Sequence, residues 1–554
     1  MFLSALHYFN RLPSWVQITI SALGVGFHAP GFGVNLLGLV AFFPFLVVLD
    51  RIHQSSDSLA KKALHTLLAC WGVGVGFGAI GLHWMIFAIH VFGHLPWIVA
   101  IAITALGYGF LVGITLFVLC GLPLFFVRRW GWWDIPVRLM FIVLLDPFYP
   151  RLLQWSFGGF TFSAVPWIAQ VADVIGEWGL SFYAMGVNFL LLLFWRWKVS
   201  GPNIELHVFR RVSLVFGFLL IVGMGYGVMR GIQLHPRLAE GASLHVAAIQ
   251  PNFSLNRIAV NPDLSYSNRK KNVEALLKDS RKALDEFPAN SPVPRLVVWP
   301  ESTYPFYFFQ KDTARETIER FAREESTAIL LASVDSQESP AGLQKSGLSI
   351  LVGPDGRVRG SYAKIVLMPF GEYIPWGEEF PAYRRWLKNA IPAIGLFEPG
   401  TEFTVYELSE DIQFSGAICF DVFSDSVVRN MVRDGASFVV NLSNLAWYGY
   451  TNASRQLEMM VRWRAIENRV PMLYVSNNGE TMFIDPLGDK MGETLGLYEQ
   501  DTLSRTIVLQ QHFSIYREYK EWMHLGAGFL LLITLLLAHR YGRIFSTPLA
   551  RECN

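Results

Sequence analysis

Long apolar runs on both sides of the chain constrain its fold more than any other feature. Residues 13–232 and 522–539 hold extended apolar stretches with few charges, whereas residues 233–521 have ordinary charge density. A helix of about 20 such residues is long enough to cross the hydrocarbon core of a bilayer. With 52% hydrophobic and only 16% charged residues, the chain is too apolar for an ordinary soluble protein. The sequence therefore predicts a membrane protein with one large domain outside the bilayer.

We predict eight membrane-spanning helices. They lie near residues 14–28, 33–49, 65–90, 97–127, 137–149, 179–196, 212–232 and 522–539. Seven of these helices make a transmembrane domain of residues 1–232, residues 233–521 form the domain outside the bilayer, and residues 522–554 hold the last helix and a tail. The N-terminus has little positive charge and the apolar runs simply continue, so we expect no cleavable signal peptide.

Basic residues mark one side of the predicted membrane domain. Alternate loops and the C-terminal tail carry Arg11, Arg51, Lys61, Lys62, Arg128, Arg129, Arg138, Arg196, Lys198, Arg210, Arg211, Arg540, Arg543 and Arg551. The opposite short loops, 29–32, 91–96 and 150–178, contain only Arg151. Loops rich in Lys and Arg stay in the cytoplasm. Residues 233–521, which join the seventh and eighth spans, are then expected on the outer side, with both chain ends cytoplasmic.

Residues 233–521 have the pattern of an α/β domain. Apolar strands are predicted at 244–250, 295–299, 328–334, 348–353, 403–407, 414–420, 437–441 and 471–476, and amphipathic helices at 267–287, 313–325, 424–434 and 453–468. Pro354-Asp355-Gly356 and Pro486-Leu487-Gly488-Asp489 are turn signals that close hairpins. Helices interleaved with short strands favour a layered α/β sandwich.

Cys419 is the only cysteine in residues 233–521. It ends the apolar run Gly416-Ala417-Ile418 and precedes a polar turn and a predicted helix. This is the expected placement of a nucleophile that a buried strand delivers to a domain surface. Cys70 and Cys120 fall in predicted spans and Cys553 in the tail, so we expect no disulfide partner for Cys419.

Glu301 and Lys364 occupy comparable positions upstream, each at or just past the end of a predicted strand. A thiol reacts as its thiolate, so it needs a base within hydrogen-bond reach, and Glu301 can accept that proton. Lys364 can stabilise the negative charge that develops on a carbonyl oxygen, and its proximity is expected to lower the pKa of Glu301 and of Cys419. The expected product is a covalent thioester that a second nucleophile resolves.

Each of these three residues alone has an ordinary structural explanation, as a core thiol, a solvated turn or a surface lysine. Their joint placement at strand ends makes that explanation much weaker. No Gly-x-Ser-x-Gly, His-Glu-x-x-His, Cys-x-x-Cys or phosphate-binding loop competes with them. The 13 histidines are scattered, so no metal or cofactor is expected, and no basic block suggests nucleic acid.

The order of Glu, Lys and Cys resembles the triad of the nitrilase superfamily, and with apolar segments on both sides the chain is similar to the bacterial apolipoprotein N-acyltransferases. The motifs that carry this resemblance are His28-Ala29-Pro30-Gly31, Gly81-Leu82-His83-Trp84, Pro166-Trp167, Gln250-Pro251-Asn252, Trp299-Pro300-Glu301, Met368-Pro369-Phe370-Gly371-Glu372, Asn441-Leu442-Ser443-Asn444, Arg464-Ala465-Ile466-Glu467 and Ser476-Asn477-Asn478-Gly479. The resemblance implies an αββα sandwich in the periplasm and a chain anchored in the bacterial inner membrane. It also implies an N-acyltransferase that moves an acyl chain from a phospholipid to the N-terminal amine of a diacylglyceryl-cysteine lipoprotein.

The resemblance also assigns residues to roles. It makes Glu301 the base, Lys364 the oxyanion stabiliser, Cys419 the nucleophile and Glu372 a second carboxylate that holds Lys364. Supporting or substrate-binding candidates are Asp421, Asn441, Ser443, Asn444, Trp447, Tyr304 and Phe306. The chain departs from the usual family pattern at Phe420, Asp421, Leu445 and Leu457 and around Arg257-Ile258, which leaves its substrate preference open. A monomer is expected.

Two aromatic segments are predicted to be lids that face lipid and keep water from the thioester. One is Tyr304–Phe309, which is too aromatic for a solvated loop. The other is residues 374–397, in which Trp376, Phe380 and Trp386 alternate with basic residues, as in interfacial segments. The alternative is that both segments simply pack against the protein.

Two functions of other classes stay open beside the acyltransferase. A membrane-tethered amidase would use the same triad and let water resolve the thioester, which requires a polar pocket open to solvent. A catalytically silent scaffold would tolerate the altered Asp421 and Leu445, but it would have no reason to keep Glu301, Lys364 and Cys419 together.

Overall fold

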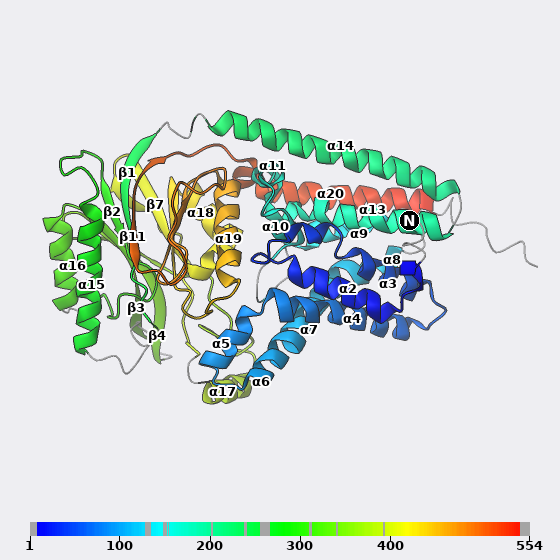
Figure 1. The fold of residues 1–554 in the computed structure, drawn as a ribbon, viewed down its shortest axis with the longest axis horizontal. Helices are drawn as coiled ribbons and strands as arrows, with labels where there is room; N and C mark the ends of the chain where they lie inside the picture. Colours follow the sequence, from blue (N-terminus) through cyan, green and yellow to red (C-terminus); the bar gives the residue numbers. More distant parts are fainter. Residues whose placement is uncertain are drawn as a thin grey trace, which may run out of the picture. The chain divides into compact units, whose positions relative to one another are not determined.

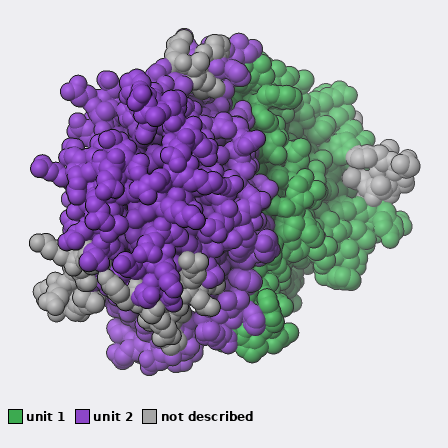
Figure 2. All heavy atoms as spheres, turned by 60° about the vertical axis from the view of Figure 1, so that its left-hand side comes forward, with its two compact units in different colours: residues 1–86, 95–230, 519–554 green, residues 87–94, 231–518 purple. Residues whose placement is uncertain are grey.

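The chain forms two compact units. The computed structural model describes residues 8–127, 134–147, 152, 155–200, 203–235, 237, 241–254, 266–309, 313–339, 342–391 and 394–542. The helical unit comprises Met1–Ile86, Leu95–Arg230 and Tyr519–Asn554, and the α/β unit comprises Phe87–His94 and Gly231–Glu518; Figure 2 colours them separately. Several predicted features lie outside the described residues: Arg128, Arg129, Arg151, the Arg257-Ile258 region, Arg543, Arg551 and Cys553.

Helices account for the regular structure described in the helical unit (Figure 1). They are α2 (Ser14–Phe27), η1 (Asn35–Leu39), α3 (Phe43–Gln54), α4 (Leu59–Gly76), η2 (Phe77–Gly81), α6 (Trp97–Ala102), η3 (Ile103–Tyr108), α7 (Gly109–Leu116), η4 (Phe117–Gly121), α8 (Leu122–Val127), α9 (Asp134–Leu145), α10 (Phe157–Phe162), α11 (Pro166–Ala169), α12 (Ala172–Gly179) and α13 (Ser181–Ser200). Three further helices run across the boundaries of the units: α5 (Trp84–Phe92), α14 (Asn203–Leu234) and α20 (Ile515–Gly542).

Five helical stretches among the described residues are long and apolar enough to cross a membrane, or six if the bent pair α12 and α13 counts as one span. The predicted count of eight is therefore not confirmed. The first predicted span is a helix of 14 residues and the fifth a helix of 12, both short for a bilayer. The third, predicted over 65–90, is interrupted after Gly81, and Phe87–His94 belongs to the α/β unit.

A buried group of four charged side chains joins three helices of the helical unit. Arg196 on α13 donates to Asp50 on α3, with Nη2 to Oδ1 at 2.6 Å, and to Asp134 on α9, with Nη2 to Oδ2 at 2.8 Å. Arg138, one turn after Asp134, donates to the same Asp134 oxygen at 3.4 Å and is fully buried. Charges inside a membrane domain are tolerated when they are paired in this way. These pairs therefore tie α3, α9 and α13 together.

The α/β unit contains two sheets. One has the strand order β11-β1-β2-β3-β4-β5 and the other β10-β9-β8-β7-β6. The strands are β1 (Ala242–Gln250), β2 (Arg295–Val298), β3 (Ala328–Ser339), β4 (Gly342–Val352), β5 (Val358–Ala363), β6 (Tyr406–Ser409), β7 (Ile412–Ile418), β8 (Phe438–Ser443), β9 (Met472–Ser476), β10 (Met482–Ile484) and β11 (Asp501–Leu509). All eight predicted strands are present, whereas β5, β10 and β11 were not predicted. Short polar strands such as β5, with alternating exposure, carry too little apolar signal to stand out.

Helices cover the outer faces of both sheets, which confirms the predicted αββα sandwich (Figure 1). The helices are α15 (Tyr266–Leu284) and α16 (Thr313–Glu324) beside the six-stranded sheet, and α18 (Asp425–Arg433) and α19 (Ala453–Asn468) beside the other. Apolar side chains of α15 and α16, among them Leu276 and Phe321, pack on Val297 and Ile329 of β2 and β3. The inner faces meet where Ser349 Oγ on β4 donates to the Gly416 carbonyl on β7 at 2.7 Å.

The two predicted lids differ in the structure. Tyr304 and Phe308 are fully buried in the core of the α/β unit, so the prediction that Tyr304–Phe309 faces lipid is wrong for these two rings. They bury more apolar area by completing the core beside α16 than a lid would allow. The second segment contains α17 (Pro381–Ala390), which has no buried residue. Trp376, Phe380 and Trp386 are 51%, 62% and 64% exposed.

Candidate active site

The predicted site residues meet where strands of both sheets end. Glu301 follows β2, Lys364 directly follows β5, and Cys419 directly follows β7. The parallel strands β7 and β8 place Ile418 opposite Leu442, so the chain leaving β8 emerges beside Cys419. The fold therefore collects side chains that are far apart in the sequence at one place.

Lys364 lies between two carboxylates. Its ammonium donates to Glu372 Oε1 at 2.7 Å and to Glu301 Oε1 at 3.3 Å. The Lys364 side chain is 2% exposed, against 16% for Glu301 and 19% for Glu372. Glu372 is itself held, because its Oε2 accepts from the Met368 backbone N–H at 2.7 Å. Lys364 is thus a fixed cation between two carboxylates. The carboxylate of Glu372 is held by a backbone N–H, and that of Glu301 interacts with the Cys419 thiol.

Burial and charge act in opposite directions on the pKa values of the triad. Burial raises the pKa of Glu301 although Lys364 opposes the rise, and burial together with the charge of Glu301 raises the pKa of the Cys419 thiol. Burial lowers the pKa of Lys364, but the carboxylates of Glu301 and Glu372 outweigh it and hold that pKa well above its ordinary value. Lys364 does lower the pKa of both partners, as expected from its proximity, but desolvation is the larger effect, so the net shift of both pKa values is upward.

These shifts define the resting protonation state. The Cys419 thiol keeps its proton and shares a hydrogen bond with Glu301, while Lys364 stays charged. Glu301 is then placed to take the thiol proton at the moment of attack, so a free thiolate need not accumulate.

The backbone at Cys419 is strained. Its φ is +47°, a left-handed conformation that non-glycine residues rarely adopt, and it opens a 3-10 turn, η8 (Cys419–Phe423). The Asn441 side chain donates to the Cys419 carbonyl at 3.2 Å, and Ser443 Oγ donates to Asn441 Oδ1 at 2.8 Å. Asn441 and Ser443 therefore support the backbone of the nucleophile from the neighbouring strand.

Both carboxylate oxygens of Asp421 accept hydrogen bonds from neighbouring groups of the protein. Its Oδ1 accepts from the backbone N–H groups of Ile365 and Val366 at 3.1 and 2.8 Å, and its Oδ2 accepts from Ile418 N–H and the Tyr362 hydroxyl, both at 2.9 Å. Burial still raises the pKa of Asp421, to about 6. Asp421 thus ties the chain after Lys364 to the chain before Cys419, and it fixes the geometry between base, cation and nucleophile.

The remaining candidates have different surroundings. Asn444 is buried, and its Oδ1 accepts from Ala446 N–H at 3.1 Å and from Asn477 at 3.2 Å, so it shapes the loop after β8. The Trp447 ring lies 4.5 Å from Phe92. Tyr304 packs against Phe306, with ring centroids 5.8 Å apart.

Three departures from the family pattern fall on buried positions. Phe420 stacks on Phe423 at 4.6 Å, and Leu445 and Leu457 are each 3% exposed.

Two residues near the site were not predicted. Tyr362 anchors Asp421. Tyr448 is buried, and burial, followed by the charge of Cys419, raises the pKa of its hydroxyl well above the ordinary value. No spacing signal in the sequence marks either tyrosine.

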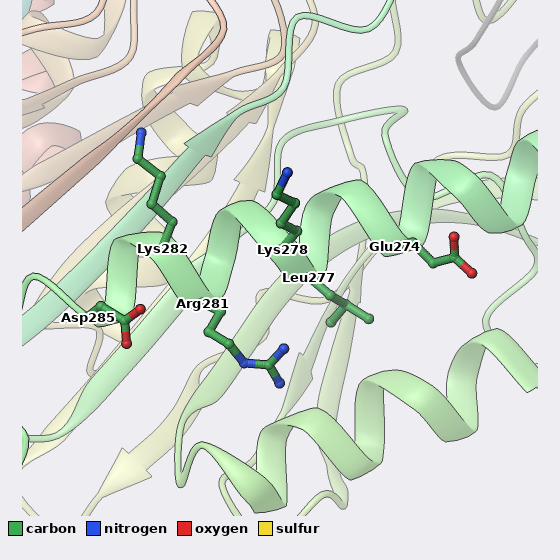
Figure 3. A pocket seen from close by; sticks show the side chains of 6 residues that line it. All are labelled: Glu274, Leu277, Lys278, Arg281, Lys282 and Asp285. Atoms are coloured by element: carbon green, nitrogen blue, oxygen red, sulfur yellow. The ribbon is translucent and has the colours of Figure 1, made fainter.

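A hollow of about 470 Å³ lies along α15 and is lined by Glu274, Leu277, Lys278, Arg281, Lys282 and Asp285 (Figure 3). It contains no residue of the predicted site. Within the part of the chain that the structure describes, no group of three or more His, Cys, Asp or Glu side chains is placed to hold a metal ion.

Both parts of the chain match known families. Residues 245–514 match the carbon-nitrogen hydrolase family, and residues 21–190 match the apolipoprotein N-acyltransferase N-terminal domain.

Relatives align along nearly the whole chain. An apolipoprotein N-acyltransferase of Geobacter metallireducens is 28% identical over 92% of this chain and 93% of its own, and one of Chlorobaculum tepidum is 25% identical over 94% and 95%. Among solved structures, a Nesterenkonia amidase of the nitrilase superfamily is 18% identical, with a TM-score of 0.38, over 52% of this chain and 98% of its own. Since both regions match and the relatives are covered almost end to end, the chain belongs to the apolipoprotein N-acyltransferase family.

Proposed function

We propose that this enzyme transfers an acyl chain from a phospholipid to the N-terminal amine of a diacylglyceryl-cysteine lipoprotein, through a thioester on Cys419. The observation that carries the mechanism is the hydrogen-bonded arrangement of Cys419, Glu301 and Lys364, with Lys364 held by Glu372 at 2.7 Å.

The first half-reaction makes the acyl-enzyme. Glu301 takes the thiol proton while Cys419 Sγ attacks the ester carbonyl of the lipid, and Lys364 stabilises the negative charge on the carbonyl oxygen. The tetrahedral intermediate expels the lysophospholipid oxygen, and protonated Glu301 returns its proton to that leaving group. Glu301 ends the step as a carboxylate, ready for the second half.

The second half-reaction uses the lipoprotein amine. Glu301 removes a proton from the attacking nitrogen, the amide bond forms, and the C–S bond breaks. The Cys419 sulfur leaves and is protonated by Glu301, which restores the resting state.

Lipid is expected to reach the site from the bilayer. The exposed rings of Trp376, Phe380 and Trp386 near α17 are typical of a segment that lies in a membrane interface. By the positive-inside rule, we place the α/β unit in the periplasm and the helical unit in the inner membrane. A periplasmic reporter fused after Gly231 should be active, and one fused near Gly201 should be inactive. The reverse pattern would refute this orientation.

An amidase is the second candidate, because residues 245–514 match the carbon-nitrogen hydrolase family. Mass spectrometry of the detergent-solubilised enzyme with phospholipid should find an acyl mass on the Cys419 peptide. Decay of that thioester should be fast with a diacylglyceryl-cysteine peptide and slow in water alone. Equal decay rates would favour the amidase.

A further inference from the structure

The triad draws its residues from both sheets. Glu301 follows β2 and Lys364 follows β5, which belong to the six-stranded sheet, whereas Cys419 follows β7 of the five-stranded sheet. The distance between base and nucleophile therefore depends on how the two sheets are held together where these strands end. A displacement of about 1 Å between reacting groups can slow a reaction about 100-fold. Hydrogen bonds that join the two sheets at this end are thus expected to control the rate.

Asp421 supplies such hydrogen bonds beside Lys364. Its carboxylate accepts from the backbone N–H groups of Ile365 and Val366, which directly follow Lys364. These bonds fix the chain after β5, whereas Glu301 follows β2, which is three strands away in the same sheet. A separate connection is therefore needed beside β2.

The strand β1 is the neighbour of β2, and the chain that leaves it emerges beside Glu301. The two strands are parallel, and Ala248 pairs with Val298. Pro251 and Glu301 each lie three residues past this pair, at the same edge of the sheet. The next residue, Asn252, has a φ of +49°, a left-handed conformation that surrounding contacts must stabilise. The segment after β1 is therefore the place where the base can be held.

Asn477 binds this segment from the other sheet. It directly follows β9 and is fully buried. Its Oδ1 accepts from the Phe253 N–H at 2.9 Å, and its Nδ2 donates to the Phe253 carbonyl at 3.0 Å. Its backbone carbonyl accepts from the Asn252 N–H at 2.9 Å, and Asn478 Nδ2 donates to Asn252 Oδ1 at 3.0 Å. These hydrogen bonds join the end of β9 to the segment after β1.

Asn477 is also connected to Cys419. Its N–H donates to the Ser443 carbonyl at 3.0 Å. Ser443 Oγ donates to Asn441 Oδ1 at 2.8 Å, and Asn441 Nδ2 donates to the Cys419 carbonyl at 3.2 Å. Asn441, Ser443 and Asn477 are all fully buried. Since buried polar networks of this kind rigidify the groups that they join, the backbone of the nucleophile and the segment beside the base are held by one network.

We propose that Asn477 is a positioning residue, which sets the distance and orientation between Glu301 and Cys419 by holding the two sheets together where β1 and β9 end. It takes no part in proton transfer, and its full burial keeps it from the substrate. The proposal gives a role to the motif Ser476-Asn477-Asn478-Gly479. It deepens the proposed acyl transfer and rests on the assignment of Glu301 as base and Cys419 as nucleophile.

Asn477→Asp tests the inference, because it keeps the shape and the oxygen that faces the Phe253 N–H but has no N–H to donate. Single-turnover acylation at saturating phospholipid should slow roughly 10–100-fold, as for a small displacement of reacting groups. The phospholipid concentration that gives half the maximal rate should not change, because Asn477 does not contact the lipid. Alkylation of Cys419 by iodoacetamide should also slow, since it needs Glu301 to take the thiol proton but needs no lipid.

Asn468→Asp is the matched control. Asn468 is 1% exposed, and its Nδ2 donates within α19 to the Arg464 carbonyl at 2.9 Å. The substitution also places a carboxylate in the interior, so it should lower the unfolding temperature and leave both rates of the folded protein unchanged.

Asn252→Gly serves as a second variant if Asn477→Asp does not fold. Glycine adopts a φ of +49° without strain, and the substitution removes the side-chain bonds from Asn478 Nδ2 and to the Tyr498 carbonyl. It should slow the alkylation of Cys419 in the same direction.

Three results would overturn the inference. One is alkylation at the unaltered rate in Asn477→Asp, or in Asn252→Gly if the first variant does not fold. Another is a higher half-saturating phospholipid concentration with an unchanged maximal rate, which would place Asn477 in lipid binding. The third is equal slowing in Asn468→Asp, which would assign the effect to a general loss of stability. If the unaltered enzyme forms no acyl-enzyme from phospholipid, the proposed function fails, whereas the alkylation rates still decide the positioning role of Asn477.

Discussion

Lys364 and Glu372 form the shorter of the two ion pairs in the candidate active site, with Nζ and Oε1 2.7 Å apart. The pair to Glu301 is 3.3 Å. Since Glu372 is fixed through the Met368 N–H at 2.7 Å, it holds the ammonium in place. Glu301 is less tightly held and stays available for proton transfer.

Glu372→Gln should slow acyl-enzyme formation roughly 10–100-fold, because a hydrogen bond between charged groups contributes about 1.5–3 kcal/mol. The substitution keeps the shape and leaves the base in place, so single-turnover acylation is the measurement to make. Glu378→Gln is the control, since Glu378 forms an ion pair with Arg384 but its side chain is 83% exposed. Equal rates for both variants would contradict a holding role for Glu372.

Cys419→Ala should abolish both the thioester and lipoprotein acylation, because Cys419 supplies the attacking sulfur. Cys419→Ser should retain a trace at most, since a hydroxyl is much harder to ionise than a thiol. Mass spectrometry of peptides after incubation with phospholipid checks both variants. An acyl group attached elsewhere in Cys419→Ala would refute the assignment of the nucleophile.

The rate of thioester formation should rise with pH, over a pH range above the one in which an ordinary glutamate ionises. The base must be ionised, and burial raises the pKa of Glu301, so the ionised fraction grows only at higher pH. Glu301→Gln should be slow and lose this rise. A pH profile of the unaltered enzyme that levels off near the usual glutamate pKa of about 4.3 would argue against the buried base.

Asp421 should make the stability of the α/β unit depend on pH. Its pKa is about 6 when folded and about 3.9 in an unfolded chain, so the folded state binds the proton more tightly. The contribution of the Asp421 proton to the free energy of unfolding is fully present below about pH 4. It is lost as pH rises through about 6, and the total loss is about 3 kcal/mol.

Asp421→Asn should remove this part of the pH dependence, measured by thermal unfolding of the full-length protein in detergent. It should also lower stability, because an amide cannot replace both carboxylate oxygens that now accept backbone N–H groups. The exposed Asp411→Asn is the control. An unchanged slope between pH 4 and 6 in Asp421→Asn would assign the titration to another group.

Arg196→Ala should destabilise the helical unit by about 3–5 kcal/mol, the usual cost of leaving buried charges without their partner. Asp50 and Asp134 would lose their shortest hydrogen bonds, of 2.6 and 2.8 Å. Thermal unfolding in detergent measures the loss, with the exposed Arg210→Ala as control. A similar unfolding temperature for both variants would mean that Arg138 alone satisfies the two carboxylates.

Local patterns in the sequence were enough to predict the strands and helices of the α/β unit and the class of chemistry. Apolar periodicity predicted all eight of the expected strands and the helices that cover the sheets, because burial on one face repeats at a fixed spacing. The placement of Glu301, Lys364 and Cys419 after strands predicted that the three would meet, because segments that leave the strands at one edge of a sheet lie close together.

Only the tertiary structure decided the features that depend on surroundings. An aromatic side chain such as that of Tyr304 suits a lid and a core equally well. Its burial follows from the space beside α16, which no local pattern encodes. The net direction of the Glu301 and Cys419 pKa shifts depends on how completely water is excluded, and proximity to Lys364 alone suggested the opposite. The hydrogen bonds between Tyr362 and Asp421 and between Asp421 and the chain after β5 join segments far apart in the sequence, so they form only once β5 and β7 lie in place.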